Sequence, residues 1–344
     1  MSPLNDGVLN HLLRVIDEPD LSSTKYRMHE RLASGGMGTI YLAYDAELER
    51  PAAVKVLHVP DPSGELEARL IREARIMARL EHPGIVPIHE VGRLACGRVF
   101  CAMKYVRGQP LDRYVRDVPD LQTRLRLFLK ICETMAFAHD QGIIHRDLKP
   151  ANIMVGPFGE VLVMDWGLAK SLGTTAGSES AAGSPMAGDD QLTQGGVVAG
   201  TPAFMAPEQA DGRAQAVDVR ADVYGLGGVL YFLLTGKAPG TKDREHPDGQ
   251  YAPVIRPRFR DSEIPKALDA VCMKALATLP EHRYANGNAL AEEISDYLDG
   301  RPLQAYRPPL WSRAAAWCSR NKVLLALLGA YLLMRFLLIF LRKS

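Results

Sequence analysis

Cysteine is scarce in this 344-residue chain, and no two cysteines stand in a CxxC arrangement. Five cysteines, an odd number, cannot all pair with one another, and the lack of CxxC argues against zinc knuckles. Both features favour a reducing compartment. The first residues also lack a charged segment followed by a short apolar run, so the sequence predicts no secretory signal peptide.

The chain also lacks a strong net charge, because its formal charge at pH 7 is +1. A dedicated nucleic-acid-binding protein carries a basic excess, so no nucleic-acid partner is expected. The near-neutral total hides an asymmetry. From Arg301 onward there are eight Lys or Arg residues and no acidic residue, whereas residues 1–300 hold 33 basic and 40 acidic side chains. The sequence therefore predicts an acidic globular body followed by a basic, apolar tail.

Hydrophobic patterns divide the chain into five parts. Residues 1–24 carry apolar residues at helical spacing, which predicts an N-terminal helical extension. Strand-like runs surround one helical stretch in residues 25–106, and helical patterns dominate residues 107–300. This order predicts an α+β fold with a small β-rich lobe and a larger helical lobe. A basic juxtamembrane linker over 301–322 and a transmembrane helix over 323–341 complete the expected organisation.

The predicted transmembrane helix is a 19-residue apolar run. As a helix it would span about 28 Å, close to the roughly 30 Å of a hydrocarbon core. Arg335 costs about 2.5–3.5 kcal/mol there, which the surrounding Leu, Ile, Val and Phe residues offset. The alternative is an amphipathic or buried helix, but the run is apolar on all faces. Basic residues flank both ends, so the positive-inside rule gives little information on orientation.

A glycine-rich turn is the first candidate phosphate site. The turn reads Ala33-Ser34-Gly35-Gly36-Met37-Gly38 and leads into a β-branched, aromatic strand. Glycines let backbone N–H groups approach a phosphate closely. The turn alone is weak evidence, because glycine-rich turns between strands are common.

A lysine and a glutamate support the same chemistry. Period-two alternation places Lys55 on the strand face shared by Ala53 and Leu57. Helical periodicity places Glu73 in the middle of an apolar stripe, where a carboxylate needs a partner. Lys55 is the natural partner. The alternative is that Glu73 lies at the edge of the stripe, in water.

The most informative segment runs from His145 to Gly167. It contains His145-Arg146-Asp147-Leu148-Lys149-Pro150-Ala151-Asn152, a hairpin with a Gly/Pro turn, and Asp165-Trp166-Gly167. Folding the hairpin brings Asn152 and Asp165 together at its open end. A carboxylate and an amide oxygen side by side are ligands suited to Mg²⁺. Asp147 and Lys149 lie just before them, on the same loop.

These motifs, in this order, resemble the eukaryotic-like Ser/Thr protein kinases of bacteria, over roughly Tyr26 to Leu298. The resemblance implies ATP and Mg²⁺ as cofactors and the γ-phosphate of ATP as the transferred group. By the same resemblance, the turn covers the phosphates, Lys55 binds them and pairs with Glu73, Asp147 handles the substrate hydroxyl, and Lys149 stabilises the transferring phosphoryl group. Asn152 and Asp165 would hold Mg²⁺.

The resemblance also assigns an adenosine site and a scaffold. Met103 would be the gatekeeper, and Lys104 to Val106 would give backbone bonds to adenine. Asp112 would reach the ribose. Further positions would line the nucleotide, namely Ala33, Ser34, Gly35, Gly36, Met37, Gly38, Ile40 and Ala53. Two structural roles are implied as well: Glu208 pairs with Arg283, and Asp222 anchors the catalytic loop.

Three positions depart from the family pattern. Ala33 replaces the first glycine of the turn, Lys104 stands at the usual acidic hinge position, and Trp166 replaces phenylalanine after the metal-binding aspartate. None of these removes a catalytic group. The larger ring of Trp166 is expected to pack inside.

The activation segment of such an enzyme would span residues 165–208. Residues 173–196 within it are rich in Gly, Ala, Ser and Thr without an apolar period, which predicts a mobile loop. Lys149 together with Thr201 resembles Ser/Thr rather than Tyr kinases, and Thr201 is expected to hydrogen-bond the catalytic loop. A phosphate on this segment would pair with Arg146. The candidate acceptors are Thr174, Thr175, Ser178, Ser180, Ser184 and Thr193, of which Thr193 is favoured.

Two rival functions remain at this point. One is a non-catalytic ATP-binding scaffold, which intact Lys55, Asp147, Asn152 and Asp165 disfavour. The other is a small-molecule kinase, which the long activation segment disfavours. The expected partners are a protein substrate, a membrane and a second copy bound through the transmembrane helix or the kinase domain. The expected location is the cytoplasmic membrane, with a single-pass C-terminal anchor and a cytoplasmic kinase domain.

Overall fold

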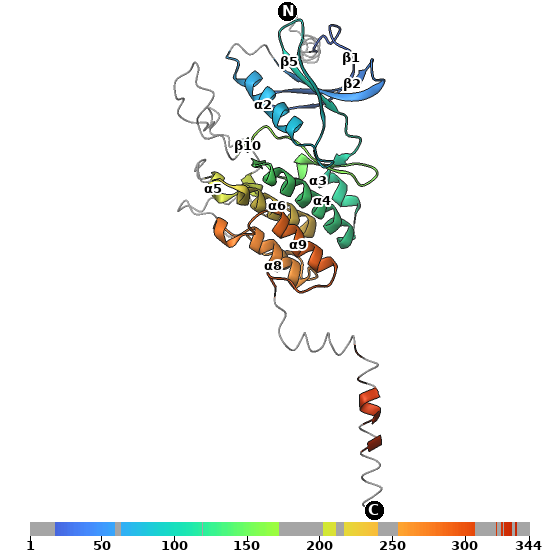
Figure 1. The fold of residues 1–344 in the computed structure, drawn as a ribbon, viewed down its shortest axis with the longest axis vertical. Coiled ribbons are helices and arrows are strands. Elements are labelled where there is room, and N and C mark those ends of the chain that lie inside the picture. Colours follow the sequence, from blue (N-terminus) through green and yellow to red (C-terminus); the bar gives the residue numbers. More distant parts are fainter. Residues whose placement is uncertain are drawn as a thin grey trace, which may run out of the picture.

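The computed structural model of the chain has a sheet-rich lobe above a helical lobe, so the predicted bilobal α+β architecture is confirmed (Figure 1). The apolar positions that predict an N-terminal helix lie in residues 1–17, outside the described residues, and residues 18–24 contain one turn and no helix. The structure describes residues 18–58, 63–118, 120–171, 202–210, 217–239 and 254–306, together with residues 321, 325, 327–331, 334 and 335.

The upper lobe is built on an antiparallel five-stranded sheet in the order β1-β2-β3-β5-β4. One long helix, α2, contacts strands β4 and β5 of this sheet. The alternation predicted for residues 52–57 is present, because Ala53 and Leu57 belong to one buried cluster while Val54 and Val56 belong to another on the opposite face. The elements of this lobe are β1 (Tyr26–Ser34), β2 (Gly38–Asp45), β3 (Arg50–Leu57), α2 (Glu65–Arg79), β4 (Ile88–Arg93) and β5 (Val99–Lys104).

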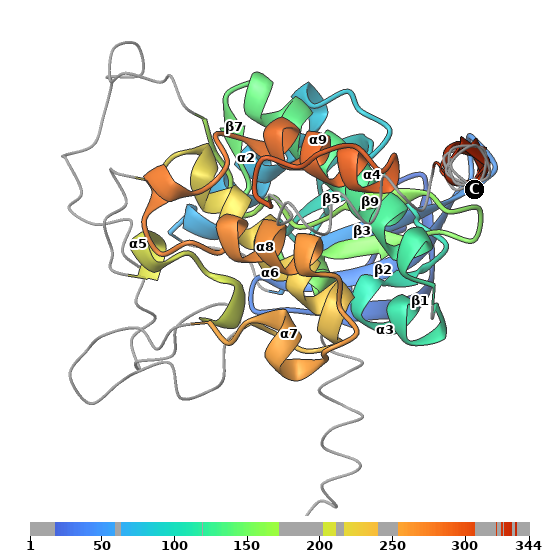
Figure 2. The same cartoon turned by 90° about the horizontal axis from the view of Figure 1, so that it is seen from below.

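The lower lobe is organised around helix α6, which contacts α4, α8 and α9 (Figure 2). Most residues of α6 are buried, as expected for a helix that is apolar on all sides. Side chains fix the starts of these helices, since Asp120 accepts from backbone N–H groups of α4 and Asp218 from one of α6. The long helices are α4 (Leu121–Asp140), α6 (Val219–Thr235), α8 (Lys266–Ala275) and α9 (Gly287–Leu298).

Short elements connect the lobes and position the loops between them. Strands β6, β8 and β9 form a three-stranded sheet, and β7 pairs with β10. The short strands are β6 (Gln109–Pro110), β7 (Ile143–Ile144), β8 (Ile153–Val155), β9 (Val161–Val163) and β10 (Lys170–Ser171). The short helices are α3 (Leu111–Tyr114), α5 (Pro207–Ala210) and α7 (Pro257–Arg260), with 3-10 turns at Val115–Asp117, Pro150–Asn152, Pro202–Phe204 and Pro280–His282.

The C-terminal apolar run is described only in part. Residues 325, 327–331, 334 and 335 are helical, and the rest of the predicted membrane helix over 323–341 lies outside the described residues. Within the part that the structure describes, no helix combines the length and the apolar character that crossing a bilayer requires. Leu325 is partly buried, whereas four other large apolar residues described here are more than half exposed, namely Leu327, Leu328, Tyr331 and Met334.

Candidate active site

Lys55 and Glu73 form an ion pair between strand β3 and helix α2. Lys55 Nζ lies 2.8 Å from Glu73 Oε2, and the two side chains are 14% and 7% exposed. The alternative that Glu73 faces water is therefore wrong. The pair joins helix α2 to strand β3 of the sheet. Removal of either partner would leave the other charge partly buried without a counter-charge.

Asp147, Lys149 and Asn152 form a hydrogen-bonded group on the loop that follows β7. Lys149 Nζ donates to Asp147 Oδ2 at 2.7 Å. Asn152 Nδ2 donates to the same carboxylate oxygen at 3.0 Å and to the backbone carbonyl of Asp147 at 2.8 Å. A carboxylate that accepts two such bonds is held in one orientation. Asp147 is thus presented as a fixed acceptor beside a cation.

Asp222, on α6, holds the same loop from below. Its carboxylate oxygens accept from the backbone N–H groups of His145 and Arg146, each at 2.8 Å, and from His139 Nε2 at 2.9 Å. Burial by itself raises the pKa of Asp222, but the bonds and charge of the two histidines outweigh it, so the pKa lies below its ordinary value. The predicted anchoring contact between Asp222 and the loop is present.

The hairpin of β8 and β9 brings Asn152 and Asp165 to its open end. Ile153 lies opposite Val163 in the ladder, and Met164 N donates to the carbonyl of Asn152 at 2.7 Å. Asp165 is exposed and has φ +60°, a left-handed conformation that is uncommon for residues other than glycine. The convergence expected from the sequence follows from this strand pairing.

Trp166 lies in the core and so holds Asp165, the residue before it, in place. Its ring is fully buried and meets the ring of His145 edge-on, with centroids 4.7 Å apart. Its indole N–H donates to the carbonyl of Val163 at 3.2 Å. The larger ring packs inside as expected. Asp165, which precedes the buried Trp166, is exposed.

The donor set at the hairpin mouth fits a magnesium ion. Asn152 uses its amide nitrogen on Asp147, which leaves its side-chain oxygen as a possible ligand, and Asp165 adds a carboxylate two residues after β9. Mg²⁺ is commonly held by one or two such side chains, with phosphates and water completing the shell. The described residues contain no group of three or more His, Cys, Asp or Glu that would bind a metal by themselves. The site therefore suits a metal that arrives with a phosphate-bearing ligand.

The glycine-rich turn closes tightly over the end of β3. Gly35 N donates to the carbonyl of Gly38 at 3.0 Å. A Cβ at Gly38 would lie 2.4 Å from the carbonyl oxygen of Val56, so only glycine fits there, whereas a Cβ at Gly36 would meet nothing within 4 Å. Ser34 Oγ and Thr39 Oγ1 are 3.1 Å apart across the base of the turn. Gly38 thus lets the turn pack against the end of β3, while the space beside Gly36 is open.

Four residues assigned to the nucleotide are buried or half-buried. Ala53 and Met103 face each other in the sheet and are 7% exposed, while Ile40 and Val106 are half-buried. The N–H of Lys104 donates to the carbonyl of Pro87 at 3.0 Å, so this N–H is not available to bind adenine.

Asp112, on α3, provides a separate test of the predicted nucleotide. Its Oδ1 atom is buried and has no hydrogen-bond partner among the described residues. A buried carboxylate oxygen without a partner is unfavourable unless a ligand satisfies it. A ribose hydroxyl is a donor of the required kind, so the side chain fits the predicted nucleotide.

Three contacts of this site were not expected from the sequence. Arg69 Nε donates to the carbonyl of Gly167 at 3.3 Å, His58 Nε2 lies 2.8 Å from the carbonyl of Gly35, and Gln209 Nε2 donates to the carbonyl of Arg146 at 2.9 Å. Arg69 precedes Glu73 by one helical turn, and that spacing would have placed both on one face. The sequence offers no comparable signal for the other two. Thr201 and the candidate phosphorylation sites lie outside the described residues.

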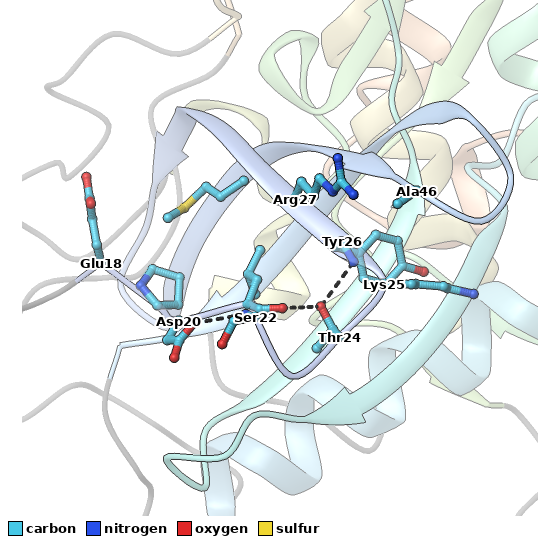
Figure 3. Close-up of a pocket in the computed structure, with 11 residues that line it drawn as sticks. Glu18, Asp20, Ser22, Thr24, Lys25, Tyr26, Arg27 and Ala46 are labelled. Carbon is cyan, nitrogen blue, oxygen red and sulfur yellow. Dashed lines mark hydrogen bonds between the residues drawn. The ribbon is translucent and has the colours of Figure 1, made fainter.

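A separate groove lies at the start of β1 (Figure 3). Its volume is about 730 Å³, and it is lined by residues 18–22, 24–28 and Ala46. None of the predicted nucleotide or metal residues lines it. The groove is therefore distinct from the candidate active site.

Comparison with known proteins gives a consistent result. The protein kinase domain family matches residues 26–293. Serine/threonine-protein kinase PknD of Protochlamydia amoebophila is 34% identical over 307 residues, which cover 82% of this chain and 30% of that protein. Serine/threonine-protein kinase PknB of Mycobacterium tuberculosis is 36% identical over 305 residues, which cover 83% of this chain and 45% of that protein. The matched part is therefore less than half of either relative.

A solved structure shares the fold. The crystal structure of the Mycobacterium tuberculosis PknI kinase domain superposes with a TM-score of 0.59 at 25% sequence identity. The superposition covers 80% of this chain and 96% of that one.

Proposed function

The chain belongs to the protein kinase family, and from that premise we propose that it transfers the γ-phosphate of ATP to serine and threonine hydroxyls of proteins. The observation that carries the proposal is the bonded group of Asp147, Lys149 and Asn152 beside a formed Lys55–Glu73 pair. Both relatives named above are serine/threonine-protein kinases.

The chemistry is mainly positioning and charge stabilisation. Asp147 orients the substrate hydroxyl and accepts its proton, because its carboxylate is fixed and ends at the mouth of the hairpin. Lys149 places a cation beside that carboxylate, where it offsets charge on the transferring group. Lys55, oriented by Glu73, binds the α- and β-phosphates.

The remaining residues bind the nucleotide and its metal. Asn152 and Asp165 would hold Mg²⁺, which neutralises negative charge on the phosphate oxygens when bound. The turn with Gly38 covers the phosphates, and Ala53 and Met103 enclose the base. Asp112 accepts a hydrogen bond from a ribose hydroxyl.

Labelling of the full chain tests this proposal. With Mg²⁺ and γ-labelled ATP, we expect label on serine or threonine of the chain itself, and mapping should find it within residues 165–208, with Thr193 as the favoured acceptor. A phosphate there would pair with Arg146 and order the segment. A chain that binds ATP but labels nothing would instead support a non-catalytic scaffold. Label confined to positions outside 165–208 would contradict the activation-segment proposal alone.

A second proposal concerns location. We propose that residues 323–341 anchor the chain in the cytoplasmic membrane, with the kinase domain on the cytoplasmic side and a homodimer contact through the helix or the kinase domain. The apolar sequence of the run and the exposure of Leu327, Leu328, Tyr331 and Met334 support it. Apolar side chains left in water favour a partner that covers them.

Removal of residues 312–344 is expected to move the protein from the membrane fraction to the soluble fraction. Autophosphorylation should then depend on protein concentration, because the anchor no longer raises the local concentration of partners. Fractionation and a dilution series measure both effects. A matched variant that keeps the length but carries Leu328→Arg and Leu333→Arg should behave like the truncation, since each buried arginine costs about 2.5–3.5 kcal/mol. Unchanged membrane association of both variants would contradict the anchor.

A further inference from the structure

Gln209 connects the helix at the end of the activation segment to the loop that carries Asp147. It lies on α5, one residue after Glu208. Its side-chain Nε2 donates to the backbone carbonyl of Arg146 at 2.9 Å, across 63 residues of sequence. Its side-chain oxygen faces back to α5 and accepts from Ala206 N at 3.4 Å. The amide therefore bridges two segments that are distant in sequence.

The carbonyl that Gln209 binds belongs to a residue with an unfavourable backbone. Arg146 has φ +70°, a left-handed conformation that side chains other than glycine adopt only where the surroundings hold it. Asp222 holds the N–H side of Arg146, with a bond of 2.8 Å. Gln209 holds the C=O side. Loss of the Gln209 bond would remove one of the contacts that hold this conformation.

The same bond fixes the peptide plane directly before Asp147. That plane contains the carbonyl of Arg146 and the N–H of Asp147. Gln209 holds the first group, and His145 Nδ1 accepts from the second at 3.2 Å. Rotation of this plane would move the Cα of Asp147 and hence its carboxylate. Gln209 and His145 thus both hold the peptide plane from which Asp147 leaves the backbone.

Helix α5, which carries Gln209, is itself held in place. Glu208 makes two bonds to the guanidinium of Arg283, at 2.6 and 2.8 Å, and the Arg283 side chain is 0% exposed. A buried bidentate pair of this kind holds its partners in one geometry. The position of α5 is therefore fixed by Arg283, which also donates to the carbonyl of Arg220 on α6, and Gln209 extends from α5 to the loop.

We propose that Gln209 is a positioning residue for phosphoryl transfer, which acts through the Arg146–Asp147 peptide rather than by touching a substrate. This inference rests on the function proposed above. It predicts a specific pattern of defects. Loss of the Gln209 bond should slow the chemical step and leave the nucleotide site intact, because the residues that bind ATP make their contacts elsewhere.

Two substitutions test the bond in the full chain. Gln209→Met keeps the length of the side chain and removes the donor, and Gln209→Glu keeps the acceptor while its ionised form cannot donate. We expect each to lower kcat about tenfold, with KM for ATP within about twofold of wild type and a Tm no more than about 4 °C below wild type. Gln122→Glu, an exposed change of the same kind at the start of α4, is the matched control and should behave as wild type.

The possible outcomes distinguish the positioning role of Gln209 from the proposed phosphoryl transfer on which it rests. Wild-type kcat in both variants, or a parallel fall of kcat and Tm with a raised KM for ATP, would overturn the positioning role while the proposed function stands. A wild-type chain that transfers no phosphate would overturn the proposed function, and this inference with it. A tenfold fall in kcat alone, absent from Gln122→Glu, supports the assignment.

Discussion

Replacement of Asp147 by asparagine is expected to lower the rate of phosphoryl transfer by about 10² to 10⁴-fold while ATP binding stays close to wild type. The side chain keeps its size, so the expected loss comes from charge and basicity rather than from shape. An amide cannot accept the proton of a substrate hydroxyl, and it attracts Lys149 less strongly than the carboxylate does.

The geometry predicts that the defect stays local. Asp147 Oδ2 accepts from Lys149 at 2.7 Å and from Asn152 at 3.0 Å, and asparagine can still accept through its side-chain oxygen. Lys55, Glu73 and the glycine-rich turn do not contact this carboxylate in the described residues. The nucleotide site should therefore survive the substitution.

The measurement is the initial rate of label transfer from γ-labelled ATP, beside nucleotide binding by calorimetry. Asp299→Asn is the matched control, because the Asp299 side chain is 57% exposed and, among the described residues, bonds only to the surface residue Arg301. It should retain wild-type activity. Transfer by Asp147→Asn at more than a tenth of the wild-type rate would contradict the role assigned to Asp147.

Replacement of Arg283 by methionine is expected to lower the free energy of unfolding by about 3–5 kcal/mol. Arg283 is the most fully bonded side chain described here. Its three nitrogens donate to both oxygens of Glu208 and to the carbonyls of Arg220, Ala277 and Thr278. Methionine fills similar space and satisfies none of these five acceptors, so Glu208 is left as a charge that is 11% exposed without its partner.

Thermal unfolding of the full chain measures the effect, and a fall of about 10 °C in Tm is expected for a domain of this size. Arg301→Met is the matched control. Arg301 also contacts two carboxylates, at 2.6 and 2.9 Å, but it is 57% exposed, so its loss should cost less than about 1 kcal/mol. Equal effects of the two substitutions would show that burial does not govern the Arg283 contact.

Local patterns in the sequence were sufficient for much of the site. Period-two alternation and helical periodicity placed Lys55 and Glu73 on facing surfaces, and the structure joins them at 2.8 Å. The hairpin with its Gly/Pro turn placed Asn152 near Asp165 because strand pairing fixes what meets at an open end. In these cases each position followed from a period or a pairing within one or two neighbouring elements.

Contacts between segments that are distant in the sequence were harder to predict from the sequence. The pairing of Glu208 with Arg283 and the anchoring by Asp222 were expected only through the family resemblance, and both contacts are present. The bond from Gln209 to Arg146 had no such guide. It depends on where α5 lies against the loop, which no residue pattern near Gln209 encodes.

The sequence by itself determined the bilobal fold, the β-strand and helix faces, and which residue types gather at the mouth of the hairpin, because each follows from periodicity, turn chemistry and motif order. Tertiary structure alone decided how that cluster is held. The left-handed backbone of Arg146 is stabilised by Asp222 and Gln209, residues 76 and 63 positions away. Such bonds need distances near 3 Å between elements whose separation is set by the packing of the whole lobe, and packing is a property of all the buried side chains together.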